Sequence, residues 1–243
     1  VAEVVVFDDR SKDHTYEVAD QYRAQHPDFP RFSIHRNPHN LGYGGNQKRC
    51  YRYCIEKGYD VVVLLHGYGQ YAPEVMQGLL DPLERGEAEM VMGSRMMPGG
   101  NPLKGGMPPY KFVGNKVLSA FENWVLGTRF FEFHSGYRAY RCDALAQVPF
   151  ERCTDEWHFD TQILLQAARA GAKLVEVPIP TYYGDEICHV NGILYGINCI
   201  LTAFGYFLNK HRIIYNRYLD IAIRGRRYFD KFNDPASSHT LIL

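Results

Sequence analysis

Two adjacent carboxylates, Asp8 and Asp9, follow a short β-branched run near the start of the chain, in the segment "FDDRSKDHT". A pair of this kind can accept hydrogen bonds from a nucleobase N–H and a ribose hydroxyl, and can therefore specify a nucleoside without a metal ion. The same two side chains can also do no more than cap the turn that follows them. The pattern by itself leaves both interpretations open.

Two further polar segments come directly after apolar runs. Asn40 and Gly42 belong to the glycine-rich "NPHNLGYGGNQ", and Arg95 ends "EMVMGSR". Open α/β sheets bind ligands at the carboxyl ends of their strands, so we expect these loops and Asp8 to share one sheet edge. Several convergent loops predict a pocket there.

The stretch "VVVLLHGYGQYAPE" places His66, Gly67, Tyr68, Gly69 and Gln70 after a run of apolar residues. The unbroken run is typical of a strand that is covered on both faces. A carboxylate in the following loop could hold a divalent cation, but the loop contains none.

The elements that must position these residues alternate between strand and helix, which predicts an α/β fold with a mostly parallel sheet and flanking helices. After Arg95 the regular alternation of strand and helix ends, and the glycine- and proline-rich segment 96–111 predicts a long functional loop. The segment "FEFHSGYRAYR" predicts irregular structure. The predicted strands are 3–7, 32–36, 61–65, 89–95 and 173–177, and the predicted helices are one ending near 26, one ending near 57, 73–84, 114–126 and 160–170.

The composition is that of a soluble globular domain, with 243 residues, 46% hydrophobic and 22% charged. Lysine plus arginine equals aspartate plus glutamate, at 27 each, so no overall charge favours nucleic acid or an acidic partner. The six cysteines include no CxxC pair, which predicts a reducing, cytoplasmic compartment. The chain opens on a predicted strand, as though the start of the domain were missing.

The segment from Val190 to Leu208 contains no charged residue, which comes close to the length of a membrane span. Its apolar side chains follow helical spacing on one side, so the helix is predicted to be amphipathic. Basic residues outnumber acidic ones from 209 to 231. Three expectations remain open: a helix packed on the sheet, an interfacial helix whose basic continuation meets anionic lipid at the cytosolic membrane face, or a true membrane span.

Several motifs together resemble family 2 glycosyltransferases with the GT-A fold, especially the branch that transfers sugars to polyprenyl phosphates. "DDRSKDHT" and "NLGYGG" resemble two glycine- and acid-containing loops of that family, and "GSR" and "SGYRAYR" resemble its later motifs. A bacterial subgroup is similar also in "GGMPPYK", "HSGYRAY" and "FDTQ". The resemblance runs in order from Val4 to about Gly196.

The resemblance implies a UDP- or GDP-sugar donor, an acceptor that can be a polyprenyl phosphate, and transfer with inversion. It implies that Asp8 and Asp9 contact the nucleoside and that Asp160 or Glu132 lies near the acceptor. It also implies that cationic side chains lie near the diphosphate, namely Lys48, Arg95, Arg138 and Arg141. The expected organisation is a catalytic domain over 1–189, an amphipathic helix and basic segment over 190–231, and a tail over 232–243.

Two departures from the family pattern bear on activity. The family's first strand and helix have no counterpart in the sequence, and Tyr68 stands where the family has a metal-binding aspartate. Because a neutral phenol is a poor ligand for Mg²⁺ or Mn²⁺, we expect weakened metal dependence or weakened catalysis. A degenerate relative that keeps the binding scaffold without transferring sugar is the alternative.

Two other functions were considered. A zinc site built from His66, His134 and His158 is disfavoured, because their separations match no metal-ligand spacing, and no metal ligand is predicted. Binding of nucleic acid has only the C-terminal arginines in its favour.

Overall fold

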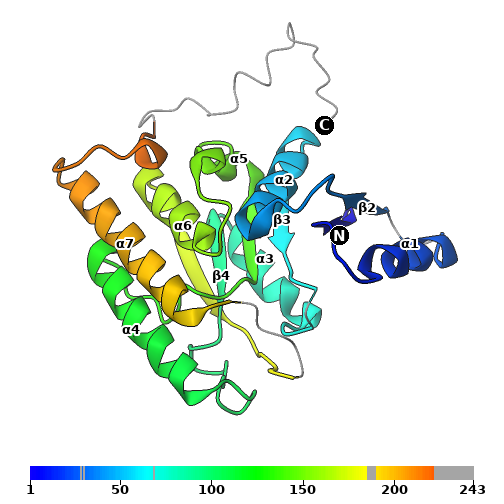
Figure 1. Ribbon diagram of the computed structural model, residues 1–243, viewed down its shortest axis with the longest axis horizontal. Helices are drawn as coiled ribbons and strands as arrows, with labels where there is room; N and C mark the ends of the chain where they lie inside the picture. Colours follow the sequence, from blue (N-terminus) through cyan, green and yellow to red (C-terminus); the bar gives the residue numbers. More distant parts are fainter. Residues whose placement is uncertain (28, 30, 68, 185–189, 222–243) are drawn as a thin grey trace, which may run out of the picture.

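The computed structural model has a four-stranded sheet in the order β3-β5-β4-β6 and a separate parallel pair, β1-β2, beside it (Figure 1). It describes residues 1–27, 29, 31–67, 69–184 and 190–221. The strands are β1 (Val4–Asp8), β2 (Phe32–Arg36), β3 (Val61–Leu64), β4 (Met90–Ser94), β5 (Arg138–Arg141) and β6 (Leu174–Pro178). The α-helices are α1 (Thr15–Gln25), α2 (Gly42–Glu56), α3 (Met76–Glu84), α4 (Pro109–Leu126), α5 (Cys142–Leu145), α6 (Phe159–Ala170) and α7 (Gly192–Lys210).

Strand β5 lies inside the sheet and runs antiparallel to both of its neighbours, β3 and β4, whereas β4 and β6 are parallel. The sequence predicted irregular structure over these residues, and that prediction was wrong. Two of the four residues of this strand are arginines, so its sequence does not look like that of a buried strand. Arg138 is nevertheless fully buried, because its guanidinium donates hydrogen bonds to the backbone carbonyls of Phe133, Ser135 and Asp160. The described sheet is therefore mixed, within the predicted α/β class.

Helices cover both faces of the four-stranded sheet. On one face, α2, α5 and α6 pack with Met90 and Tyr140 in one apolar cluster. On the other face, α3 packs with Val91 and Ala139. Consecutive residues of β4 and β5 thus point to opposite faces, as the two-residue period of a strand requires. The carboxyl ends of β3, β4 and β6 and the start of β5 meet at one edge of this three-layer body.

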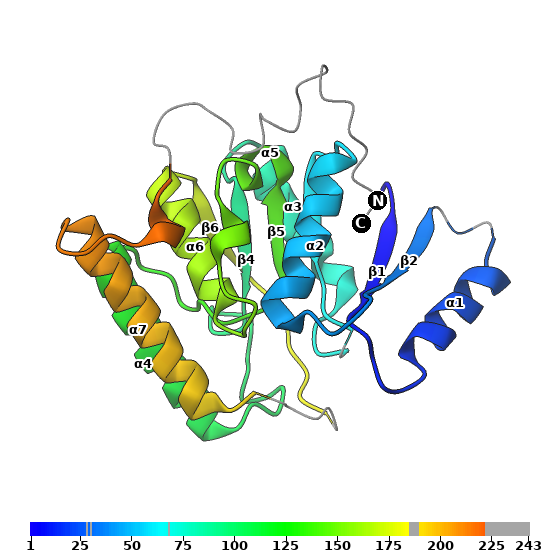
Figure 2. The same ribbon diagram turned by 45° about the horizontal axis from the view of Figure 1, so that its top comes forward.

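The β1-β2 pair joins the main body through α2 (Figure 2). The ring of Phe7 in β1 packs edge-on against Tyr53 of α2, with 5.6 Å between centroids. The Tyr53 hydroxyl also donates to the Glu3 carboxylate at 3.1 Å. Helix α2 therefore holds the two sheets together, and its first turn reaches the edge where β3 and β4 end.

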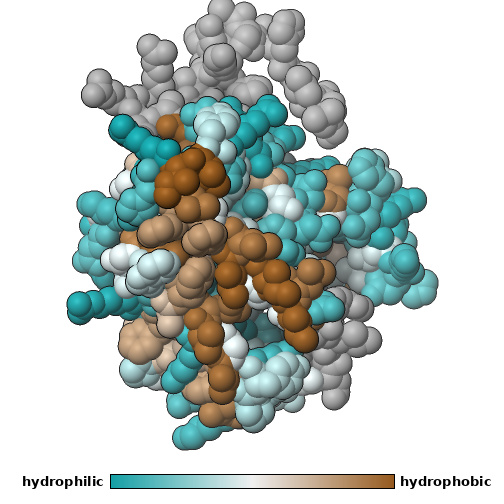
Figure 3. All heavy atoms as spheres, turned by 60° about the vertical axis from the view of Figure 1, so that its left-hand side comes forward, coloured by the Kyte–Doolittle hydropathy of each residue, from teal (hydrophilic) through white to brown (hydrophobic). Residues whose placement is uncertain are grey.

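Helices α4 and α7 lie side by side, and both start at the same end of the molecule (Figures 1 and 2). With α6 they enclose a small apolar cluster that contains Val125, Leu165, Ala203 and Tyr206. The segment predicted over 190–208 is thus a helix packed on α4 and α6. Figure 3 shows that much of its apolar side remains at the surface. Its length and hydropathy would suffice to cross a membrane, and 22% of its apolar window is buried in the protein.

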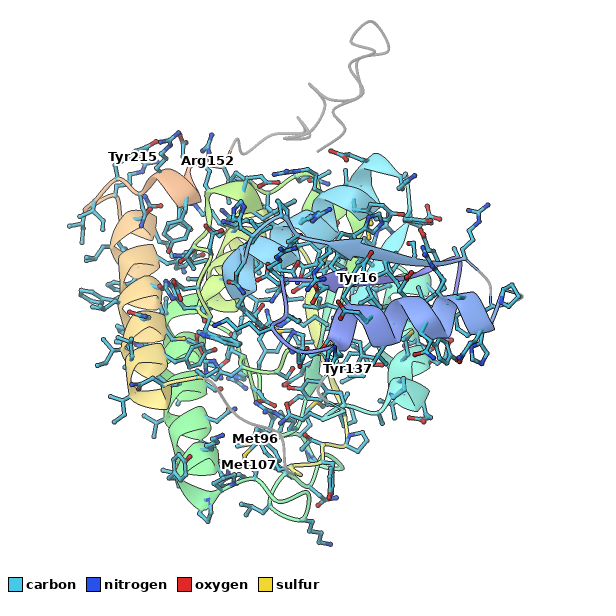
Figure 4. The ribbon with its side chains drawn as sticks, turned by 45° about the vertical axis from the view of Figure 1, so that its right-hand side comes forward. Tyr16, Met96, Met107, Tyr137, Arg152 and Tyr215 are labelled. Atoms are coloured by element: carbon cyan, nitrogen blue, oxygen red, sulfur yellow. The ribbon has the colours of Figure 1, made fainter. Side chains whose placement is uncertain are left out.

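The chain after α7 folds back toward α6. Arg152 donates hydrogen bonds to the carbonyls of Arg217 and Asp220, each at 3.2 Å. Figure 4 shows Arg152 and Tyr215 at this end of the molecule, and Met96 and Met107 at the opposite end, where α4 starts. Of the predicted basic segment, Lys210, Arg212 and Arg217 are described; its remaining basic residues lie outside the described part of the chain.

Most of the remaining elements match the predicted ranges to within a few residues. The main difference is α4, which begins at Pro109, five residues before the predicted start. Proline is well suited to the first helical position because it lacks an N–H and its φ is already helical. The predicted helix over 73–84 divides into a 3₁₀ turn, Pro73–Val75, followed by α3.

Helix α2 approaches the segment before α6 so closely that only glycine fits at position 44. A Cβ at Gly44 would lie 2.8 Å from the Phe159 Cβ and would also overlap the carbonyl of Thr154. We expect Gly44→Ala to destabilise the protein by about 1–3 kcal/mol through overpacking. The control is Gly78→Ala in α3, where a Cβ meets nothing within 4 Å and helix propensity favours alanine by roughly 0.5–1 kcal/mol. Equal urea midpoints for the two variants would contradict this account.

Candidate functional site

A cleft of about 680 Å³ opens at the edge where β3 and β4 end and β5 begins. Its walls come from the first turn of α2, the loop after β3, the starts of α4 and α7, and the segment that precedes α6. Most of the wall is aromatic or aliphatic, and its polar members include Tyr43, His66, Gln70, Arg95, Lys111, His134, Asp160 and Tyr195.

Asp160 supplies a carboxylate to the cleft although its side chain is only 6% exposed. The Tyr43 hydroxyl donates to its Oδ2 at 2.6 Å, and Gln47 donates to its Oδ1 at 3.3 Å. Burial and the neighbouring carboxylate raise the pKa of Tyr43 well above its usual value, so the hydroxyl stays a hydrogen-bond donor. Tyr43 also stacks on Trp157, with ring centroids 4.5 Å apart.

Arg138 lies behind Asp160 and does not line the cleft. Its Nη2 is 3.8 Å from Asp160 Oδ2, and its guanidinium donates to backbone carbonyls. Burial opposes its charge, but the negative potential of Asp160 and the neighbouring Tyr140 and Tyr43 together outweigh burial and raise the pKa of Arg138. The arginine therefore balances the charge of Asp160 and orients it, and its geometry argues against the predicted contact with diphosphate.

His66 lies between α2 and β5. Its Nε2 is 3.4 Å from the Tyr43 hydroxyl, and its ring packs on Gly136, where any Cβ would overlap the imidazole. Burial lowers the pKa of His66, so the ring is neutral at pH 7. A neutral imidazole here can accept or donate one hydrogen bond without adding charge to the cleft.

Arg95 and Glu132 form a buried ion pair on the opposite wall. Glu132 also accepts from the Arg95 backbone N–H at 2.7 Å and from Asn115 at 2.6 Å, while Arg95 Nη1 donates to the Tyr183 hydroxyl at 2.7 Å. Burial disfavours both charges, but their attraction outweighs it, raising the pKa of Arg95 and lowering that of Glu132. Glu132 is thus a partner of Arg95, whereas the sequence suggested it as an acid near the acceptor.

His134 and Glu122 form a second buried pair, under the start of α7. His134 Nε2 lies 3.1 Å from Glu122 Oε2, and His134 Nδ1 lies 3.0 Å from the Tyr195 hydroxyl. Burial opposes protonation of the ring, but Glu122 and Cys199 together outweigh burial and raise the pKa of His134 to about 10. The His134 ring, which lines the cleft, is therefore held as a cation paired with the Glu122 carboxylate.

The residues predicted to bind the nucleoside lie apart from this cleft. The Asp8 side chain is fully buried and paired with Arg36 at 3.1 Å, which argues against direct contact with a ligand. Asp9 Oδ1 accepts from the Leu41 N–H at 2.7 Å, and Asn40 donates to the Asp9 carbonyl. These contacts fix the loop that leads into α2, and Gly42, with φ of 79°, completes the turn.

Lys48 and Arg141 also occupy positions other than those predicted. The Lys48 ammonium donates to the Cys153 carbonyl and to Asp155 at 2.7 Å, which anchors α2 to the segment before α6. Arg141 pairs with its neighbour Asp143 at 2.6 Å. Neither residue lines the cleft.

The loop after β3 is only partly described, because Tyr68 lies outside the described residues. His66 and Gln70 line the cleft, whereas Gly67 and Gly69 are exposed on either side of position 68. Gly69 has φ of 70°, a conformation that other residues rarely adopt.

Residues 1–148 match the protein-family model described as glycosyl transferase family 2. The chain belongs to this family. It is 32% identical over 179 residues to an undecaprenyl-phosphate mannosyltransferase from Micrococcus luteus, covering 73% of this chain and 71% of that protein. It is 29% identical to a polyprenol monophosphomannose synthase from Mycolicibacterium smegmatis, covering 72% and 65% of the two chains.

The fold of this family 2 chain also matches solved structures. Glucosyl-3-phosphoglycerate synthase from Mycobacterium tuberculosis, solved with Mn²⁺ and UDP-glucose, aligns with a TM-score of 0.60 at 17% identity, covering 85% of this chain and 68% of that one. At this identity the match shows the fold, which is the GT-A fold that the motifs predicted.

Relatives with this fold are solved with Mn²⁺, but the loop after β3 does not fit such an ion. From His66 to Tyr71 the sequence has no carboxylate, and hard cations require oxygen ligands. The cleft's nearest carboxylate, Asp160, already accepts from Tyr43 and Gln47. No step of the chemistry is therefore assigned to a metal at this loop.

Several cleft residues of this transferase were not predicted from its sequence, among them Tyr43, Lys111, Trp157, Tyr183 and Tyr195. Tyr43 lies within the "NLGYGG" motif, and it is the tyrosine of this motif that reaches Asp160, while Asn40 and Gly42 shape the turn. No spacing in the sequence connects Tyr195 or Tyr183 to the same site.

The His134–Glu122 pair predicts a pH dependence of stability. Its folded pKa of about 10 lies above the ordinary value of 6.5. Its stabilisation is thus complete below about pH 6.5 and is lost as the pH rises through about 10. In metal-free buffer, we expect the difference in free energy of unfolding between the native protein and His134→Gln to shrink from pH 6.5 to pH 10. A difference that stays constant over this pH range would refute the assignment.

Proposed function

We propose that this protein transfers a sugar from a UDP- or GDP-sugar to a polyprenyl phosphate, with inversion at the anomeric carbon. The names of two relatives, a mannosyltransferase and a mannose synthase acting on polyprenyl phosphates, support the acceptor class. The observation that carries the proposal is the form of the cleft: an apolar wall, a carboxylate and cations at its floor, and an opening toward exposed apolar helices.

The mouth of the cleft is suited to the phosphate head of the acceptor. Lys111 lines this part of the cleft, and so do residues at the N-terminal starts of α4 and α7. The partial positive charge of two helix N-termini, added to this cation, favours a phosphate at this place. The isoprenoid chain would then continue along the apolar surface of α4 and α7.

The donor would occupy the side of the cleft next to the loop after β3. His66, Gln70 and Arg95 face this side and can donate to diphosphate oxygens. Asp9, Asn40 and Gly42 lie at the end of β1 and the start of α2, close in sequence to Tyr43, and are the proposed edge of the nucleoside site. Asp8 and Lys48 are proposed to support this edge from the interior.

Asp160 is the proposed catalytic carboxylate, and Arg138 positions it. Where the acceptor carries a proton on its attacking oxygen, Asp160 would take that proton as the bond to the anomeric carbon forms and the nucleoside diphosphate leaves. A lipid phosphate is largely ionised at neutral pH, so Asp160 would contribute less there. Tyr43 and Gln47 hold both carboxylate oxygens, which fixes their direction before the acceptor binds.

Replacement of Asp160 should separate transfer from binding. We expect Asp160→Asn to lower the rate of sugar transfer to a polyprenyl phosphate by at least about tenfold, and by about 100-fold or more for a hydroxyl acceptor. The affinity for the donor, measured by isothermal titration with UDP- and GDP-sugars, should change less than about threefold. The matched control is Asp60→Asn, an exposed carboxylate outside the cleft.

The same titrations, carried out with and without Mn²⁺, test whether donor binding depends on a metal ion. Because the loop after β3 lacks a carboxylate, donor affinity should depend little on Mn²⁺. Donor binding without transfer to any acceptor would favour the degenerate, non-catalytic relative. Full transfer by Asp160→Asn would contradict the assigned role of the carboxylate.

We also propose that the protein acts at the cytosolic surface of a membrane. Large apolar side chains are exposed along α4 and α7, including Val117, Trp124, Ile197, Leu201 and Phe204. Figure 3 shows hydrophobic residues gathered on one face of the molecule. An amphipathic face of this kind lies in the lipid interface, and the basic residues after α7 would meet anionic head groups. The same face adjoins the mouth of the cleft, where a lipid acceptor must enter.

Vesicle flotation tests this surface. We expect the protein to bind vesicles that contain anionic lipid, and the pair Ile197→Glu with Leu201→Glu to weaken binding by about tenfold or more, since burying each apolar side chain is worth roughly 1.5–3 kcal/mol. The control is Val18→Glu in α1, which is equally exposed but at the other end of the molecule (Figure 1). Equal binding of both variants would exclude α7 as the docking surface.

A further inference from the structure

Three potential metal ligands from distant parts of the chain meet beneath the start of α7. They are Glu122 in α4, His134 before β5 and Cys199 in α7, and their ligand atoms all lie within 4.8 Å of one another. The three side chains are almost completely buried: Cys199 is 0% exposed, and the side chains of Glu122 and His134 are 2% and 6% exposed. No sequence motif joins positions 122, 134 and 199.

The orientation of two of these groups points to a shared ligand. Glu122 Oε2 and His134 Nε2 are 3.1 Å apart, yet neither makes a well-directed hydrogen bond. Donor atoms bound to one zinc ion at about 2.0–2.3 Å lie roughly 3.3–3.7 Å from each other. The observed spacing is near this range, and the ligand atom of Cys199 lies within 4.8 Å of those of the other two residues.

The surroundings of the histidine match those of a metal ligand. His134 Nδ1 lies 3.0 Å from the Tyr195 hydroxyl, so its other nitrogen, Nε2, is held toward Glu122 and Cys199. A hydrogen bond on the second ring nitrogen usually fixes the tautomer and direction of a metal-binding imidazole. Thr161 adds a hydroxyl 3.3 Å from Glu122 Oε1 and 3.4 Å from Cys199 Sγ.

We propose that Glu122, His134 and Cys199 bind one zinc-like divalent cation, with water or the Thr161 hydroxyl in the fourth position. Thiolate, imidazole and carboxylate together suit zinc and disfavour magnesium. Metal binding takes a neutral imidazole, a thiolate and a carboxylate, so any proton on the bound nitrogen or sulfur leaves as the ion enters. The two negative charges of the thiolate and the carboxylate then balance the two positive charges of the ion.

The ion would have a structural role that differs from that of a metal at the diphosphate. It joins α4, α7 and the segment before β5, three parts of the cleft wall, and two of the residues involved, His134 and Tyr195, line the cleft. The inference does not depend on the proposed sugar transfer, because it rests on the cluster alone.

Titration of the full, metal-free chain with Co²⁺ tests the site. We expect one equivalent to bind with a near-ultraviolet thiolate-to-cobalt absorption band, and Zn²⁺ to displace it. Cys199→Ser should lose this band, and Glu122→Gln should keep it with affinity lowered by about tenfold or more. The control is Cys54→Ser, a half-buried thiol of α2 outside the cluster, which should retain both the band and the affinity.

Thermal unfolding with and without Zn²⁺ tests the site even if a substitution changes the stability of the protein. Zn²⁺ should raise the melting temperature of the native protein and of Cys54→Ser but not that of Cys199→Ser, since a ligand that binds only the folded state stabilises it. Absence of a stoichiometric thiolate band in the native protein, or an unchanged band in Cys199→Ser, would overturn the proposal.

Discussion

The hydrogen bonds from α2 to the Asp160 carboxylate determine how the parts of this molecule meet. Tyr43 and Asp160 are 117 residues apart in sequence and 2.6 Å apart in space. This contact requires α2 to lie directly against the start of α6, which the absence of a side chain at Gly44 permits. Because α2 also carries Tyr53 against β1, the same helix places the β1-β2 pair beside the cleft. The Asp160 carboxylate, which lines the cleft, is thus linked through α2 to both sheets.

The walls of the cleft contain more buried charge than stability alone would favour. Arg138 faces Asp160, Arg95 faces Glu132 and His134 faces Glu122. Buried pairs of this kind repay their desolvation poorly, and apolar replacements of the same shape are often as stable. Their concentration around one apolar cleft is therefore better explained by a function that needs fixed charges in a dry place. Each partner also prevents the other from moving, so the polar groups are held in position before a ligand arrives.

Local periodicity predicted most helices and strands, and the family resemblance identified Asp160 and the loops near it. The sequence did not predict β5, because an arginine such as Arg138 is usually found at the surface. Arg138 can be buried only because the folded chain supplies three backbone carbonyls that accept its hydrogen bonds. The nucleoside pair was predicted as a direct contact, but Arg36 covers Asp8. The cluster of Glu122, His134 and Cys199 was equally invisible, since only the packing of α4 against α7 brings its members together. In each case the deciding partner is distant in sequence.

The order of strands in the central sheet has a consequence for the nascent chain on the ribosome. Strands β3 and β4 are neighbours in sequence, but β5 separates them in space and is made 44 residues after Ser94. Until Arg141 has emerged, β3 and β4 have no strand to join them, and their unpaired edges are open to other chains. Between the synthesis of Ser94 and that of Arg141, the incomplete sheet is therefore prone to aggregate. Chaperones that cover apolar segments would act during this interval.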